Sequence, residues 1–133
     1  MINLLHYLRP SSCNYRLKGE ELICVRFTAY MREMTLTGRC KYVWFHVSNE
    51  GSAAGKQIWG SRQRNMGKFA GVADYIFLGN TNLALEMKDG KKPLQPSQKD
   101  FQSWCESCEV HFKTAHSLEE AVEIVESMKI TIP

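Results

Sequence analysis

Residues 67 to 104 read GKFAGVADYIFLGNTNLALEMKDGKKPLQPSQKDFQSW, and they contain two apolar runs separated by turn residues. The runs are DYIFLG at 74 to 79 and LALEMK at 83 to 88, with residues 80 to 82 between them. Short aromatic and aliphatic runs around such a turn are typical of a β-hairpin, and Asn82 tolerates the left-handed backbone that a three-residue loop needs.

The register of this hairpin decides which polar residues meet. With residues 80 to 82 as the loop, Asp74 is expected to pair with Lys88, and Ile76 to lie opposite Glu86. Because side chains alternate along a strand, the odd positions then form an apolar face, while Asp74, Glu86 and Lys88 share the other face.

Two carboxylates and an ammonium group on one half-buried face cost stability unless they act together. Paired carboxylates suit Mg²⁺, which prefers oxygen ligands and keeps several waters. A lysine beside them can stabilise charge on a phosphate. The alternative is a surface salt bridge between Glu86 and Lys88 on an open sheet face.

Working outward, hydrophobic periodicity predicts helices and strands on both sides of the hairpin. The expected elements are an irregular segment 1–19, a helix 20–34, a strand 41–48, a short helix 56–64, a helix 96–106, a strand 109–115 and a helix from the Ser117 cap to 128. This order predicts an α/β fold with a small mixed central sheet of about four strands flanked by helices.

Length and composition narrow the class of protein. The 133 residues fit a single domain over 1–133, and 44% hydrophobic with 23% charged residues argues against a disordered or fibrous chain. No apolar run is long enough to span a membrane, and the start lacks a basic export signal. Five cysteines, an odd number, are expected to be reduced thiols in a cytoplasmic protein.

Positive charge is concentrated in one segment. Between residues 51 and 73 the chain carries Lys56, Arg62, Arg64 and Lys68 and no acidic residue. Such a segment can follow the phosphates of DNA, and the alternative is a solvated loop.

Three tryptophans could stack on nucleic-acid bases. Trp44 and Trp104 are expected to belong to the core. Trp59 lies in the basic, glycine-containing segment and is therefore the candidate for a contact with DNA.

The same stretch resembles the virus-type replication-repair nuclease (VRR-NUC) domain, a branch of the PD-(D/E)xK nucleases. That family has a GxxAGVxD segment before a strand, a second strand ending in ExK, and a helix that bears a glutamine. The matching residues here are Gly67, Gly71, Asp74, Glu86, Met87, Lys88 and Gln98. Ala73 stands where many members have proline.

The resemblance extends from about Glu20 to Met128. In the first helix, Glu20 and Ile23 match the family's spacing, and Cys24 replaces the usual glutamine. HVSNEG at 46 to 51 is similar to the family's strand ending in NEG.

The resemblance implies a restriction-endonuclease-like core with one metal site. Asp74 and Glu86 would bind Mg²⁺, for which Mn²⁺ can substitute, and the Met87 carbonyl would complete the protein ligands. Lys88 would be the catalytic lysine. No organic cofactor is implied.

Two further site residues follow from the resemblance. Gln98 would position Lys88 or the phosphate, and it shares a helix face with Phe101. Glu20 would contribute from the first helix through a water, and it lies on the apolar face with Cys24, unlike Glu21. Placement at a helix start is the alternative explanation for Glu20.

The expected protein is a stand-alone metal-dependent DNA nuclease, an endonuclease for junctions or flaps in bacterial or phage replication and repair. DNA would be its substrate, and a homodimer would place two sites on opposite strands. A non-catalytic DNA-binding module with the same fold is the alternative, and dependence on a divalent metal separates the two.

A zinc site is a separate interpretation of the C-terminal third. Cys105, Cys108, His111 and His116 have the spacing C-x2-C-x2-H-x4-H. These four ligands would have to converge from a helix, a turn, a strand and a loop, which argues for free thiols instead.

Overall fold

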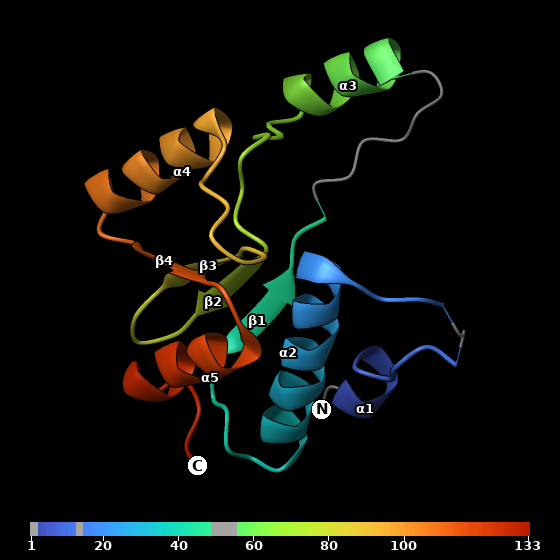
Figure 1. The fold of residues 1–133 in the computed structure, drawn as a ribbon, viewed down its shortest axis with the longest axis vertical. Coiled ribbons are helices and arrows are strands. Elements are labelled where there is room, and N and C mark those ends of the chain that lie inside the picture. The colour runs from blue at the N-terminus through green and yellow to red at the C-terminus, as the bar shows by residue number, and fades with distance from the viewer. Residues whose placement is uncertain (1–2, 13–14, 49–55) are drawn as a thin grey trace. The chain divides into compact units, whose positions relative to one another are not determined.

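The computed structural model of the protein describes residues 3–12, 15–48 and 56–133. Its elements, in chain order, are α1 (Leu4–Tyr7), α2 (Gly19–Leu36), β1 (Val43–His46), α3 (Lys56–Asn65), β2 (Tyr75–Leu78), β3 (Leu83–Met87), α4 (Pro96–Ser107), β4 (His111–Ala115) and α5 (Leu118–Ser127) (Figure 1). Every expected helix and strand is present, and α1 is an addition in the segment that was expected to be irregular. None of the helices in the described ranges is long and apolar enough to cross a membrane.

The strands form a four-stranded sheet in the order β1-β2-β3-β4. β2 and β3 are antiparallel. β4 runs parallel to β3, because His111 N–H donates to the Asn82 carbonyl (3.1 Å) at one end and Lys88 N–H donates to the Ala115 carbonyl (2.9 Å) at the other. The sheet is therefore mixed, which confirms the predicted fold class.

The register of the hairpin differs from the expected one by two residues. Tyr75 lies opposite Leu85, so the predicted pairing of Asp74 with Lys88 is wrong. Leu83 pairs with Phe77 and not with Gly79, so residues 78–82 lie between the paired positions in place of the expected 80–82. Within this turn the Asn82 side chain accepts a hydrogen bond from Gly79 N–H (3.3 Å). A shift of two leaves the alternation of faces unchanged and brings Asp74 into line with Glu86.

The structure divides into two compact units. The second unit consists of Trp44–Glu86 and Pro93–Lys113, and the first unit of Met1–Val43, Met87–Lys92 and Thr114–Pro133. The prediction of one domain over the whole chain stays a prediction.

In the second unit, α4 packs on the hairpin. The buried cluster consists of Ala73, Ala84, Cys105 and Phe112, with Ile76, Leu94, Phe101 and Val110 packed against it. Ile76 and Ala84 are even positions, on the side of the hairpin that carries Asp74 and Glu86. Helix α4 therefore covers the centre of the polar face of the hairpin. The salt-bridge alternative required this face to be open to solvent, and it is not.

In the first unit, α2 packs against α5. Phe27 and Met31 of α2 and Ala121 and Val125 of α5 are fully buried. The Ser117 side chain caps α5 by accepting from Glu120 N–H, as the sequence predicted.

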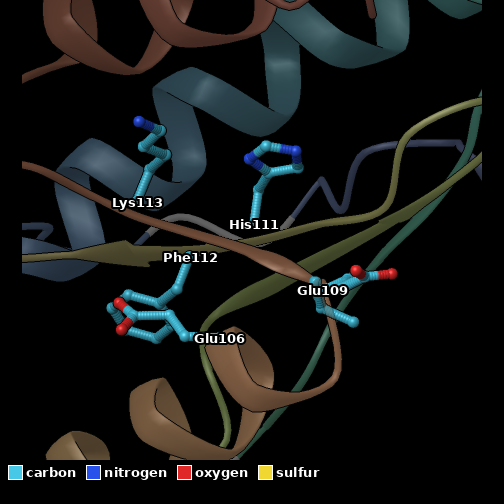
Figure 2. Close-up of a pocket in the computed structure, with 6 residues that line it drawn as sticks. Glu106, Glu109, His111, Phe112 and Lys113 are labelled. Carbon is cyan, nitrogen blue, oxygen red and sulfur yellow. The ribbon is translucent and has the colours of Figure 1, made fainter.

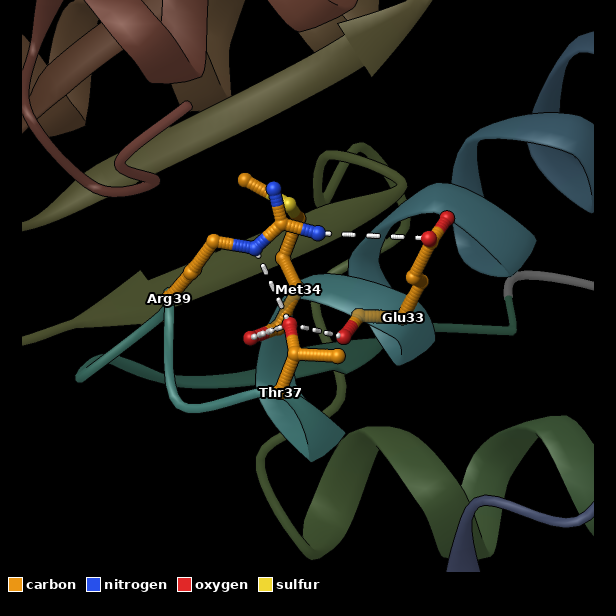
Figure 3. Close-up of polar contacts among 4 residues, drawn as sticks. All are labelled: Glu33, Met34, Thr37 and Arg39. Carbon is orange, nitrogen blue, oxygen red and sulfur yellow. Dashed lines mark hydrogen bonds and ion pairs between the residues drawn. The ribbon is translucent and has the colours of Figure 1, made fainter.

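The C-terminal end of α2 is closed by side-chain contacts (Figure 3). Thr37 Oγ1 donates to the Glu33 carbonyl (2.7 Å), and Arg39 Nε donates to Thr37 Oγ1 (3.1 Å). Gly38 takes a positive φ of 75°, which allows the chain to leave the helix. Ile132 N–H then donates to the Arg39 carbonyl, so the C-terminal segment is held where α2 ends.

Candidate active site

Two carboxylates lie opposite each other in the hairpin. Asp74 directly precedes β2, and the register Tyr75↔Leu85 continued by one residue places it across from Glu86. Directly opposed residues of an antiparallel pair have Cβ atoms about 4.5–5.5 Å apart. Glu86 is only 2% exposed and Asp74 is half-buried. The pair is thus close enough for one cation to contact both side chains.

Gln98 fixes the position of the Glu86 carboxylate. Its Nε2 donates to Glu86 Oε1 (3.3 Å), while its own Oε1 accepts from Gln95 N–H (2.8 Å). The second contact belongs to a capping box at the start of α4, which orients the amide group. The sequence predicted Gln98 near Lys88 or a phosphate, and the hydrogen bond that the structure shows is with Glu86.

Gly71 explains why α4 begins so close to the carboxylates. A Cβ atom on Gly71 would collide with the backbone of Ser97 and would lie 2.7 Å from Gln98 N. Only glycine lets the two backbones approach this closely, and this approach places Gln98 beside β3.

Lys88 follows β3 directly and is buried, with 5% of its surface exposed. Its N–H donates to the Ala115 carbonyl, so the backbone is still extended at this point. Because it is the second residue after Glu86 on an extended segment, its side chain leaves the same face of the strand.

The loop after Lys88 is held by contacts within the first unit. Glu20 Oε1 accepts from Asp89 N–H (3.4 Å), and Glu21 is exposed. His116 Nδ1 lies 2.6 Å from the Gly90 carbonyl. The sequence pointed to Glu20 through its place on the apolar face of the helix, whereas no motif pointed to the contact of His116 with Gly90.

The donor set in the hairpin fits a hydrated magnesium ion. Within the described ranges, no group of three or more histidine, cysteine, aspartate or glutamate side chains could hold a metal. Asp74, Glu86 and the predicted Met87 carbonyl are all hard oxygen donors. Mg²⁺ accepts such a small set because waters fill its remaining positions.

The zinc interpretation is wrong for the four residues that suggested it. They form no metal-binding group in the described part of the chain. Cys105 is buried, and burial raises the pKa of its thiol, with Cys108 and Glu106 adding to the effect. Zinc requires a thiolate, which such an environment disfavours. Cys108 is a free, exposed thiol.

The two thiols are therefore expected to differ in reactivity. Cys108 should be alkylated by iodoacetamide at mildly alkaline pH at least about tenfold faster than Cys105, because the buried thiol has the raised pKa and is shielded. Peptide mass spectrometry over a time course measures both rates. Equal rates in the folded protein would contradict this assignment, and both thiols should react alike in urea.

The basic residues lie on and after α3. Arg62, Arg64 and Lys68 are exposed, and Lys68 Nζ donates to Gln63 Oε1 (2.8 Å). The side chains of Lys56 and Trp59 lie outside the described part of the structure, as do residues 49–51 of the predicted NEG motif.

Trp104 is not a core residue. It is 55% exposed, so the expectation of burial is wrong. Trp44, the other tryptophan expected in the core, is half-buried.

A surface hollow of about 440 Å³ lies where α4 leads into β4 (Figure 2). It is lined by Glu106, Glu109, Val110, His111, Phe112 and Lys113. Figure 2 shows His111 and Lys113 on one side of β4 and Phe112 and Glu106 on the other, so the two basic side chains lie across the strand from the Glu106 carboxylate. The predicted site residues Asp74, Glu86 and Lys88 are not among those that line it.

Comparison with solved structures identifies the class of fold. A structure described as "VRR_NUC domain protein" matches with a TM-score of 0.63, covering 88% of this chain and 93% of that chain at 16% sequence identity. No family model and no curated protein matches the sequence. The chain therefore has the fold of a VRR-NUC domain, as its motifs predicted.

Proposed function

We propose that this protein is a divalent-metal-dependent DNA nuclease. Its active site for hydrolysis of phosphodiester bonds would contain Asp74, Glu86 and Lys88. One observation carries the proposal. Among the described residues, Glu86 and Lys88 are the charged side chains that are buried, and they lie two positions apart at the end of an interior strand. Buried charges cost several kcal/mol each by general estimates, so their retention beside a second carboxylate supports a chemical role.

Each residue has a distinct task in this proposal. Asp74, Glu86 and the Met87 carbonyl would hold Mg²⁺, or Mn²⁺ in its place, and a bound ion supplies Lewis-acid chemistry to the phosphodiester. The Lys88 ammonium stabilises the negative charge that develops on the phosphate. Gln98 holds the Glu86 carboxylate in place by its hydrogen bond. Glu20 orders the loop after Lys88 through the Asp89 peptide.

DNA would be bound largely through its backbone. The exposed Arg62, Arg64 and Lys68 and the basic Lys56 supply the positive charge, and arginine suits bidentate contacts with phosphate. The proposal includes cleavage of junctions or flaps during replication or repair in a bacterial or phage-infected cell. It also includes a homodimer, which would place two sites on opposite strands.

The proposal is tested with a set of labelled duplex, flap, junction and single-stranded DNAs in Mg²⁺, Mn²⁺ or chelator. We expect cleavage of at least one substrate with either metal and none with chelator. Asp74→Ala should lower the rate in Mg²⁺ by about tenfold or more, with partial recovery at high Mn²⁺, because one carboxylate remains.

Glu106→Ala is the matched control, since it removes an exposed carboxylate from the same unit. It should cleave at the parent rate. Cleavage that persists in chelator would contradict metal dependence. DNA binding without cleavage under any condition would identify the protein as a non-catalytic module.

A further inference from the structure

An aromatic cluster in the second unit runs from the core to the surface. Phe112 is buried and contacts Phe101, with ring centroids 6.3 Å apart. Phe69 contacts both Phe101 (5.7 Å) and Trp104 (5.5 Å), and Trp104 meets Phe101 edge-on (6.3 Å). The outermost ring, Trp104, keeps more than half of its surface exposed.

This arrangement makes Trp104 a preformed contact surface. The rings of Phe69 and Phe101 hold the indole from the protein side, so little conformational freedom is lost when a ligand binds. A tryptophan that served only the core would be expected to bury most of its surface, because burial of apolar area stabilises the fold.

The chain that leads into Phe69 is basic. Lys68 precedes Phe69, and its N–H donates to the Gln63 carbonyl (2.9 Å), so the segment folds back on the end of α3. Arg62 and Arg64 are exposed on the last turn of that helix. An exposed ring whose supporting residue Phe69 follows a basic segment is complementary to a base attached to a phosphate backbone.

Of the two acids on α4, Asp100 and Glu106, the first lies on the same side of the helix as Trp104. Asp100 is exposed and precedes Trp104 by one helical turn. It disfavours a phosphate on its own side of the ring, so we expect the backbone to pass on the side of Phe69 and Lys68.

We propose that Trp104 stacks on an unpaired base, and that the substrate is therefore DNA with a single-stranded part, such as a flap or an overhang. This inference rests on the proposed function and names its substrate class. Bases within an intact duplex are already stacked on one another, so a tryptophan on the surface gains a base only where pairing is interrupted.

The experiment measures DNA affinity without cleavage, by fluorescence anisotropy of labelled DNA in Ca²⁺. A single strand, a flap and a fully paired duplex of the same sequence are compared. Trp104→Ala should weaken binding to the single strand and the flap by about tenfold, and binding to the duplex by less than about twofold. Trp104→Phe keeps a ring and should remain within about threefold of the parent.

A second readout does not depend on the alanine variant being stable. Single-stranded DNA should quench the tryptophan fluorescence of the parent, and this quenching should fall in Trp104→Phe, because the stacking indole is absent. Leu78→Ala is the control, since it removes an exposed apolar side chain from the same unit. It should change neither affinity nor quenching.

The outcomes separate this inference from the proposed function. Equal losses on single strand and duplex, or no loss in either, would overturn the stacking role while metal-dependent cleavage still stood. Loss of self-association in Trp104→Ala with unchanged DNA binding would assign the ring to a protein contact and would also overturn it. Absence of DNA binding in the parent would overturn both proposals.

Discussion

Replacing Lys88 by alanine is expected to slow DNA cleavage by about a hundredfold or more, equivalent to about 3 kcal/mol of transition-state stabilisation. The change removes the positive charge and leaves both carboxylates, Asp74 and Glu86, in place. The variant should therefore still bind Mg²⁺. This binding is measured as the rise in melting temperature on addition of the metal. Single-turnover cleavage on the preferred substrate measures the rate.

Two further variants make this result interpretable. Because Lys88 is buried, alanine leaves a void, so Lys88→Met should be made as well to remove the charge at similar volume. Lys113→Ala removes an exposed lysine and should leave the rate unchanged. If both Lys88 variants cleave DNA at the parent rate, the residue has no catalytic part and the proposed site loses its central member.

Replacing Gly71 by alanine is expected to destabilise the fold by about 3 kcal/mol, at the upper end of the usual cost of overpacking. The new methyl group would meet the backbone of Ser97 and Gln98, which cannot rotate away as a flexible side chain would. Equilibrium unfolding in urea measures the effect as a lower midpoint. Cleavage should also fall in the folded fraction, because α4 carries the Gln98 amide away from Glu86.

Gly60→Ala is the matched control for this change. Gly60 lies within α3, and among the described residues no atom beyond its two neighbours and the backbone of its own helix is found within 4 Å of the position a Cβ would take. Alanine there should be neutral or should stabilise the protein by up to about 1 kcal/mol, because it favours the helix. Equal stability of the Gly71 and Gly60 variants would contradict the close approach between Gly71 and α4.

The shared face of Asp74 and Glu86 was predictable because it depends only on the period of two along a strand and on the parity of the loop. Their direct opposition was not. It depends on the length of the turn, which spans residues 78–82 and not the expected 80–82. Periodicity constrains which residues share a face, whereas the length of the turn selects among registers of the same parity.

The surroundings of α4 show a similar limit. Its helical period correctly predicted that Phe101 and Cys105 face the core. The same period places Trp104 beside Phe101, where exposure depends on which distant segment covers the edge of the helix. That segment is the one around Phe69, which covers only part of the indole. The exposure of Trp104 could therefore not be predicted from the sequence of α4 alone.

The double use of Gln98 restricts which residues evolution can place at the start of α4. A capping box accepts either glutamine or glutamate at this position, so helix formation alone would tolerate both. Here the side chain accepts from Gln95 N–H with one atom and donates to Glu86 with the other. An ionised glutamate has no proton to donate and would add a third negative charge beside the pair. The substitution Gln98→Glu is therefore compatible with the capping box but not with the acidic pair. The Gln98 amide group has to satisfy both requirements at once.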